Sequence, residues 1–233
     1  DSYREICNLV FIEYDRSSDG NLNPLPNKHV DTGMGLERVV SVVNGYKSNY
    51  DSDLFQPIIE KIISLTDKNY DYKDGTPHRV IADHIRMVSF SLADGILPSN
   101  DGRGYVVRRI LRRASRFARE LGVTEPMLYR LVEALESCMA EHYPEIKDKR
   151  DHIEKIIKTE EESFLRTLDR GIEEYNKIVS GLDSGAIIPG ESAFKLYDTF
   201  GFPIDLTQMM AREAGISVDF QGFEVSMKKQ KDR

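Results

Sequence analysis

The nine residues DTGMGLERV, at positions 31 to 39, combine an acid, two glycines and an arginine in a spacing that could bind a flat, anionic ligand. In a strand, alternate side chains face the same way, so Asp31, Gly33 and Gly35 would share one face. The glycines would leave that face bare for a ring or another backbone. Arg38 follows, where its guanidinium could bind phosphate, and Asp31 could pair with an ammonium group. Spacing alone favours a plainer interpretation, a glycine-kinked strand packed on a helix with Arg38 in a surface ion pair.

A second set of residues suited to binding is a row of arginines with no acidic residue among them. At helical spacing the apolar residues of this segment form one stripe, and most of its arginines share another side. In a chain of formal net charge −7, such a row favours contact with phosphates, which adds affinity without reading sequence. The alternative is a solvated face that pairs with acids such as those at 160–162. The arginines are Arg103, Arg108, Arg109, Arg112, Arg113, Arg116 and Arg119.

The composition is that of an ordinary globular protein. With 233 residues, 40% hydrophobic and 30% charged, the chain is long enough for one or two domains with buried cores. Cys7 and Cys138 form no C-x-x-C pair, and the histidines form no H-x-x-x-H pair, so we expect no metal site. This cysteine usage favours a reducing compartment, and we expect a cytoplasmic protein. The longest apolar stretch is far too short to span a bilayer, so we expect no membrane partner.

The elements that must position these residues change in character along the chain. Residues 6–14 are rich in β-branched and aromatic side chains and predict a strand. Turn formers fill 15–27 and indicate a long hairpin connection before a second strand at 28–35. The predicted fold is mainly α, with a short α+β piece over 1–50 and helical periodicity over 51–233. Because the chain enters a strand almost at once and lacks an initiator Met, we expect an excised part of a longer protein.

The segment HVDTGMGLERVV resembles motif 3 of the class II aminoacyl-tRNA synthetases, in its alanyl-tRNA synthetase form. Five further stretches resemble the same family in the same order: EICNLVFIEYDR, KSNYDSDLFQPII, ADHIRMVSFSLADGILPSNDGRGYVVRRILRRASR, GESAFKLYDTFGFPIDLT and GISVDFQGFE. One motif would be weak support, but ordered matches over nearly all of the chain are specific. The resemblance implies that 1–50 is the C-terminal part of a class II aminoacylation domain, with a remnant of its antiparallel sheet. It implies that 51–233 is the helical tRNA-recognition domain.

The resemblance also implies a parent enzyme with alanine-tRNA ligase activity. Such an enzyme activates alanine with ATP and Mg²⁺ and transfers it to the 3′ end of alanine tRNA. Arg38 matches the arginine that contacts the ATP γ-phosphate. Gly33 and Gly35 match the glycines that floor the ATP and alanine site. Asn8 and Asp31 match the residues that hold the alanine α-ammonium and neighbouring polar groups.

The sequence departs from the family in two ways. Cys7 stands where the family usually has Trp, so an alanine pocket lined by that residue would have a different shape. Motifs 1 and 2 and the editing domain have no counterpart in these residues. We therefore expect the chain alone not to form alanyl-adenylate, and any zinc of the parent enzyme to lie in the editing domain.

For RNA, the resemblance implies recognition of a G·U pair in the acceptor stem of alanine tRNA. The minor groove exposes the guanine 2-amino group, which in a G·U pair lacks its usual partner and can donate to a carboxylate or amide oxygen. Asn100 and Asp198 match the residues that read this pair. Without the family, Asn100 fits a turn and Asp198 fits a helix cap. The arginines expected to contact tRNA are Arg108, Arg109, Arg112, Arg113 and Arg116.

Two other functions fit the same residues. One is a non-catalytic RNA-binding module, and the other is a helical protein-interaction domain whose arginines bind an acidic partner. A truncated hairpin would also leave an open sheet edge, so self-association is a further hypothesis. Light scattering that shows a strict monomer at high concentration would exclude it.

Overall fold

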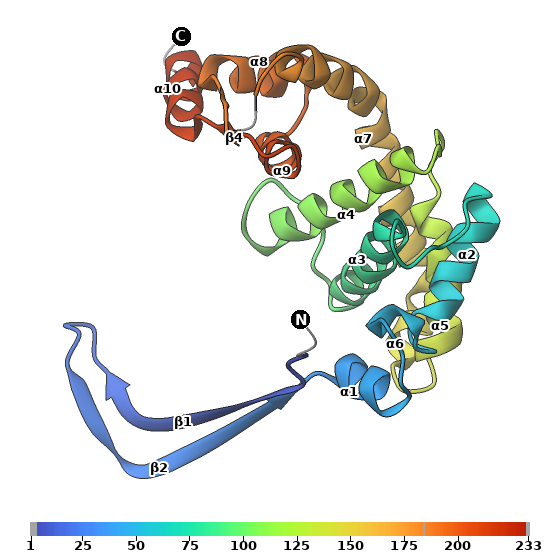
Figure 1. Ribbon diagram of the computed structural model, residues 1–233, viewed down its shortest axis with the longest axis vertical. Coiled ribbons are helices and arrows are strands. Elements are labelled where there is room, and N and C mark those ends of the chain that lie inside the picture. Colours follow the sequence, from blue (N-terminus) through green and yellow to red (C-terminus); the bar gives the residue numbers. More distant parts are fainter. Residues whose placement is uncertain (1–3, 184, 232–233) are drawn as a thin grey trace. The chain divides into compact units, whose positions relative to one another are not determined.

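The computed structural model describes residues 4–183 and 185–231, which form two compact units that divide between Gln56 and Pro57 (Figure 1). The first unit holds a two-stranded antiparallel hairpin, a short helix and a 3₁₀ turn. The second is built almost entirely of helices. The predicted fold, mainly α with a small antiparallel sheet, is confirmed.

In the first unit, β1 (Cys7–Arg16) pairs with β2 (Leu22–Met34), and α1 (Leu36–Val43) follows at once. The 3₁₀ turn η1 (Asn49–Asp51) comes next. A capping box holds its start, because the Ser48 hydroxyl accepts from the Tyr50 N–H and the Asp51 carboxylate accepts from the Ser48 N–H. The hairpin therefore leads directly into α1, which carries the predicted arginine.

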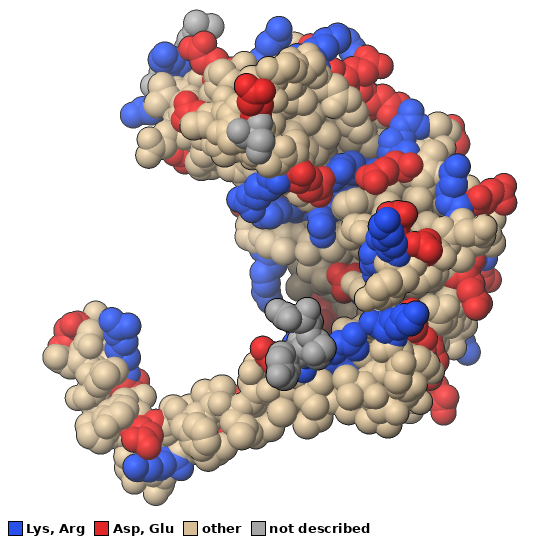
Figure 2. All heavy atoms as spheres, viewed as in Figure 1, with Lys and Arg blue, Asp and Glu red and all other residues tan. Residues whose placement is uncertain are grey.

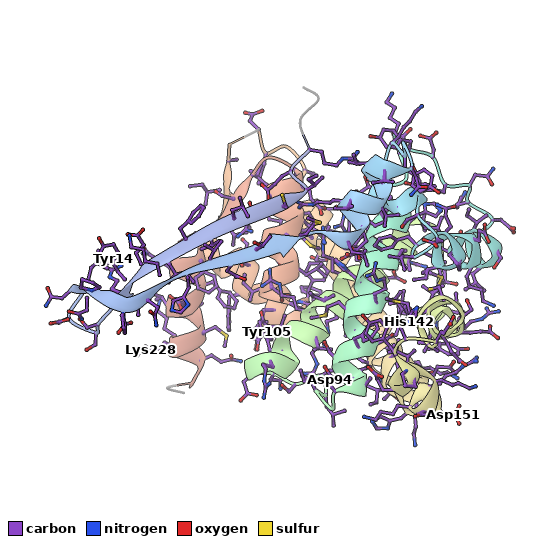
Figure 3. The ribbon with its side chains drawn as sticks, turned by 90° about the horizontal axis from the view of Figure 1, so that it is seen from below. Tyr14, Asp94, Tyr105, His142, Asp151 and Lys228 are labelled. Atoms are coloured by element: carbon purple, nitrogen blue, oxygen red, sulfur yellow. The ribbon has the colours of Figure 1, made fainter. Side chains whose placement is uncertain are left out.

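The hairpin turn is much shorter than the sequence predicts. A long connection over 15–27 was expected, but β1 runs to Arg16 and β2 begins at Leu22. A two-stranded ribbon has two free edges, so a proline such as Pro24 can take part without removing a ladder hydrogen bond. Tyr14, its partner across the ribbon, lies near the turn (Figure 3). Local turn propensity therefore overstated the length of the loop.

The second unit consists of helices that follow the predicted apolar spacing. Within the part of the chain that the structure describes, no helix is long and apolar enough to cross a membrane. The 3₁₀ helix η2 (Leu128–Leu131) leads into α5. The helices are α2 (Gln56–Thr66), α3 (Thr76–Ala93), α4 (Gly102–Glu120), α5 (Val132–Met139), α6 (Pro144–Asp148), α7 (Arg150–Val179), α8 (Gly190–Phe200), α9 (Ile204–Glu213) and α10 (Phe220–Lys231).

The long helix α7 contributes to both parts of the core. Ile153 and Ile157 on its first half are fully buried, and this half packs against η2 and α5. Phe164 at its middle and Leu168 on its second half join the core formed with α8, α9 and α10. A Cβ at Gly171 would overlap the ring of Phe202, so only glycine lets α7 approach the corner between α8 and α9 this closely. This contact helps to set where α9 lies, facing α4 (Figure 1).

A second small sheet was not predicted. β3 (Ile187–Ile188) pairs in parallel with β4 (Ser217–Val218) and joins the segments before α8 and α10. Ile188 is fully buried in the same core as Phe164. Two residues are too few for an alternating pattern, so the sequence contains no signal for this pairing.

Glu161 is an acidic side chain inside the second unit and is only 1% exposed. Its carboxylate accepts a hydrogen bond from the backbone N–H of Leu128 at 3.0 Å, which ties α7 to the start of η2. Burial raises the pKa of Glu161 from 4.5 to about 7, although the N–H groups of Met127 and Leu128 partly oppose the shift. The native state therefore binds a proton that the unfolded chain releases in the mildly acidic range.

This raised pKa predicts that stability falls as the pH rises. The stabilisation is fully present below the unfolded pKa and is lost as the pH passes through the folded pKa, because the carboxylate must then be buried as an anion. Between about pH 5.5 and about pH 8 we expect the free energy of unfolding to fall by about 2 kcal/mol through this group. Urea unfolding of Glu161→Gln should lack this contribution, whereas the control Glu173→Gln, at an exposed position of the same helix, should retain it. Equal pH slopes in both variants would contradict the assignment.

Candidate functional site

The hairpin brings three of the predicted residues onto one face. Asn8 on β1 lies directly opposite Gly33 on β2, and alternation places Asp31 on the same face. A Cβ at Gly33 would meet no atom within 4 Å, so the strand surface is open there. The Asp31 carboxylate accepts from the Thr32 N–H at 2.9 Å and is exposed. This face therefore combines an open backbone surface with one amide and one carboxylate.

The space beside Gly35 is filled by Arg38 and is not bare. A Cβ at Gly35 would lie 3.1 Å from Arg38 Cδ, so the glycine makes room for the aliphatic stem of the arginine. Arg38 Nη1 donates to the backbone carbonyl of Glu5 at 3.1 Å and lies 3.6 Å from its carboxylate. Asn8 Nδ2 donates to the same carboxylate at 3.0 Å. Glu5 thus links two predicted site residues.

Sequence reasoning did not identify Glu5, because its role depends on the strand pairing that carries it toward α1. Cys7 stands where the family usually has Trp, and the sequence predicts a different shape for an alanine pocket lined by that residue. Strand alternation places its side chain with Met34 on the face opposite to Asn8 and Gly33. Among the described residues, Arg38 Nε and Nη2 have no hydrogen-bond partner and can bind an anion.

In the second unit, Asn100 and Asp198 lie in the wall of one cavity of about 460 Å³. Asn100 stands just before α4, and Asp198 lies on α8, far away in the sequence. Tyr105, on the first turns of α4 (Figure 3), lines the same cavity. Burial raises the pKa of Tyr105, and the nearby carboxylate of Asp205 adds to the shift. The fold therefore brings together the two residues predicted to read a base pair.

Their neighbours decide what each residue can offer. Arg108 Nη1 donates to Asn100 Oδ1, and a guanidinium has only donors, so the amide NH₂ of Asn100 is left to donate elsewhere. Asp198 accepts from Gln230 Nε2 at 2.5 Å and is exposed. It does not cap α9, which follows Pro203. The cavity wall therefore presents one amide donor and one carboxylate acceptor.

The predicted arginine row on α4 is largely neutralised by acids from α7 and α9. Glu160 lies 3.0 Å from both Arg108 and Arg112, and Asp205 lies 3.5 Å from Arg109. In Figure 2, basic side chains alternate with acidic ones around this region. The row is thus a set of guanidiniums held in place by carboxylates. The other pairs are Arg116 with Glu213 and Glu120, and Arg119 with Asp169.

Aromatic rings hold two of these arginines from the core side. The guanidinium of Arg112 lies 5.2 Å from the ring centre of Phe164, and that of Arg116 lies 4.7 Å from the ring centre of Phe117. Arg109 differs, since its side chain is 55% exposed. Because each guanidinium carries five N–H donors, an arginine paired with one carboxylate still has donors for another anion. The row can therefore bind phosphates while its geometry is set by acids.

Metal-ligating residues do not gather among the residues that the structure describes. Across residues 4–183 and 185–231, no three His, Cys, Asp or Glu side chains are grouped as a metal ion would require. Glu5 is engaged by Asn8 and Arg38. The Glu5 carboxylate therefore serves a hydrogen bond and an ion pair.

Comparison with known proteins places this geometry in context. A family model described as tRNA synthetases class II (A) matches residues 1–233. The alanine–tRNA ligase of Chlorobium phaeobacteroides is 52% identical over 235 residues, which cover 98% of this chain and 26% of that relative. The alanine–tRNA ligases of Staphylococcus epidermidis and Halorhodospira halophila are 47% and 49% identical, and 27% of each is covered. The chain spans about a quarter of the length of these curated relatives.

The double ion pair of Glu160 predicts a large effect of a small change. In Glu160→Gln, two half-buried guanidiniums lose their shared counter-ion, and we expect the free energy of unfolding to fall by about 1–3 kcal/mol. Glu162→Gln is the matched control, because its exposed carboxylate lies 4.0 Å from Lys158. Its effect should stay within about 0.5 kcal/mol. Urea denaturation of both variants tests this, and similar losses would show that the Glu160 pairs contribute nothing special.

Proposed function

The chain belongs to the class II tRNA synthetases, and from that premise we propose that it forms part of an alanine–tRNA ligase. In this proposal 1–50 closes the aminoacylation domain and 51–233 is the helical domain that recognises tRNA. The parent enzyme would activate alanine with ATP and transfer it to alanine tRNA. The names of the relatives and their identity over nearly all of the chain support this assignment.

The observation that carries the RNA-binding role is the shared cavity of Asn100 and Asp198. In the minor groove of a G·U pair, guanine offers its 2-amino donor, while purine N3 and pyrimidine O2 are acceptors. Asp198 has only acceptors and would take the 2-amino group. Asn100, whose oxygen is held by Arg108, would donate from its NH₂ group to a base acceptor. This assignment differs from the expectation that both residues accept. It provides an acceptor, Asp198, for the guanine 2-amino group and a donor, the Asn100 NH₂ group, for a base acceptor of the same pair.

The α4 arginines would supply the part of the affinity that does not depend on sequence. An acceptor stem has a wide, shallow minor groove flanked by phosphates, so a protein that reaches its base edges also lies close to the backbone. Arg109 is the most exposed of the arginines that line the cavity, and Arg108 and Arg112 flank it. Phosphate contacts of this kind orient the stem, and the two polar side chains then discriminate the pair.

Binding to an acceptor minihelix tests this role. We expect the chain to prefer a G·U minihelix over its G·C counterpart by about 1 kcal/mol or more, the scale of one base-edge contact. Asp198→Ala should remove the preference. Glu191→Ala, which removes one exposed charge from the same helix, should keep it. Fluorescence anisotropy over a salt series gives both the preference and the ionic contribution.

Asn100→Asp separates two explanations for Asn100. The carboxylate can still accept from Arg108, but it has lost the NH₂ donor. If Asn100 donates to a base, the ratio of G·U to G·C affinity collapses in this variant. An unchanged ratio would contradict the donor role. Steep salt dependence without any preference in the unmodified chain would contradict reading by this cavity, and no binding at all would favour the protein-interaction alternative.

The first unit would form one wall of the ATP and alanine site. Gly33 leaves the strand surface open to substrate, and Asn8 and Asp31 on the same face are suited to an ammonium group. In adenylate formation an alanine carboxylate oxygen bonds to the α-phosphorus of ATP, and the bond to pyrophosphate breaks. Arg38 and its free guanidinium nitrogens would neutralise the leaving phosphates. No three His, Cys, Asp or Glu side chains of the described residues are grouped as a metal ion would require, so a Mg²⁺ ion bound with ATP would be held mainly by phosphates and water.

Arg38→Gln tests this wall in a full-length ligase that carries these residues. We expect alanine-dependent ATP–pyrophosphate exchange to fall about 10²- to 10³-fold, the effect of removing one preorganised donor. Minihelix binding should not change. Lys28→Gln is the charge-matched control, since Lys28 lies on β2 and pairs with Glu13 at 3.2 Å. Exchange that falls equally in both variants would contradict the role of Arg38.

A further inference from the structure

Arg113 has an environment unlike that of its neighbours on α4. Its Nη1 lies 2.8 Å from His84 Nε2, its Nε lies 3.0 Å from Met209 Sδ, and its guanidinium lies 5.4 Å from the ring centre of Phe117. None of these groups is an anion. Five other arginines of α4 each face a carboxylate, namely Arg108, Arg109, Arg112, Arg116 and Arg119. A half-buried cation without a direct counter-ion is costly unless a ligand supplies one.

The imidazole of His84 keeps Arg113 in this state. A guanidinium can only donate, so His84 Nε2 must accept, and its proton must lie on Nδ1. Nδ1 in turn lies 2.9 Å from the Asp83 carboxylate, whose pKa is lowered by this hydrogen bond. The chain from Asp83 through His84 therefore orients Arg113 while a neutral ring separates the two charges. His84 is only 8% exposed, so the arrangement is built into the fold.

Arg113 opens into a cavity of about 540 Å³ between α4 and α9. Arg212, an exposed residue of α9, lines the same cavity and has no acidic partner among the described residues. The two carboxylates in the lining are already paired, Asp205 with Arg109 and Glu213 with Arg116. Shared lining residues, including Arg109 and Asp205, place this cavity next to the one that holds Asn100 and Asp198.

We propose that the α4–α9 cavity binds a phosphodiester of the RNA backbone through Arg113 and Arg212. The inference rests on the proposed function, since it places one strand of the stem in the α4–α9 cavity, next to the cavity that holds Asn100 and Asp198. Two guanidiniums that have no acidic partner among the described residues can form charge-assisted hydrogen bonds to the phosphate oxygens. Free phosphate shares this chemistry and is the other source that the experiment must distinguish.

The salt dependence of minihelix binding tests the site. The logarithm of the binding constant falls linearly with the logarithm of the salt concentration. Each lost phosphate contact should make this slope shallower by about 0.7–0.9. We expect this decrease for Arg113→Gln and for Arg212→Gln, with the G·U preference retained. Lys61→Gln removes the same charge from α2, outside the arginine row, and breaks a pair with Glu133 at 3.0 Å, and its slope should not change. Because Arg212 is exposed, its variant keeps the test valid even if Arg113→Gln unfolds.

Two outcomes separate this site from the proposed function. If the unmodified chain binds RNA but Arg212→Gln has the same slope as Lys61→Gln, the site is overturned and the proposed function stands. If the unmodified chain binds no RNA, the proposed function fails, and NMR of the arginine side chains during titration with inorganic phosphate decides the site. Saturable shifts at Arg113 and Arg212 would retain an anion site and overturn RNA as its source. No shifts would overturn the site itself.

Discussion

Carboxylates on other helices neutralise most of the arginines that lie close together on α4. Two unit charges about 4 Å apart interact by about 4 kcal/mol at the effective dielectric constant near a protein surface, so a row of like charges would disfavour a packed helix. Glu160 on α7 serves two of these arginines, and Asp205 and Glu213 on α9 serve two more. The same ion pairs connect α4 with α7 and α9. The ion pairs that neutralise the row therefore also hold α4 against α7 and α9, and side chains of α4 and α9 line the two cavities.

The pairing also changes what a basic helix can contribute to recognition. Free arginines would bind any phosphate, whereas arginines held by carboxylates have fixed directions and fewer free donors. Arg108 shows the consequence, because it lies beside Glu160 and its contact with Asn100 decides which end of that amide faces the cavity. Arg113 shows the opposite case, in which a neutral imidazole leaves the guanidinium available. Non-specific and specific contacts thus arise from one row through different partners.

In the first unit, too, a single carboxylate holds an arginine of the candidate site in place. Glu5 contacts Arg38 and Asn8 and couples the start of β1 to α1. Gly35 leaves room for the Arg38 stem to lie against the backbone, while Gly33 leaves open surface. The alternating glycines therefore serve two purposes, one structural and one suited to a ligand. The alternating glycines look equivalent in the sequence, but their different neighbours in the structure give them different roles.

Patterns within a few residues were enough to predict the helical body, the strand that leads to Arg38 and the arginine row, because helical and strand periodicity are local properties. The sequence overstated the turn over 15–27 and contained no signal for the pairing of β3 with β4, which joins residues far apart in the chain. Which acid meets which arginine, the orientation of Asn100 and the lack of an acid beside Arg113 were decided by the tertiary structure alone. Charge neutralisation and hydrogen bonding depend on distances of a few ångströms between distant segments, and only the packing of α4 against α7 and α9 sets those distances.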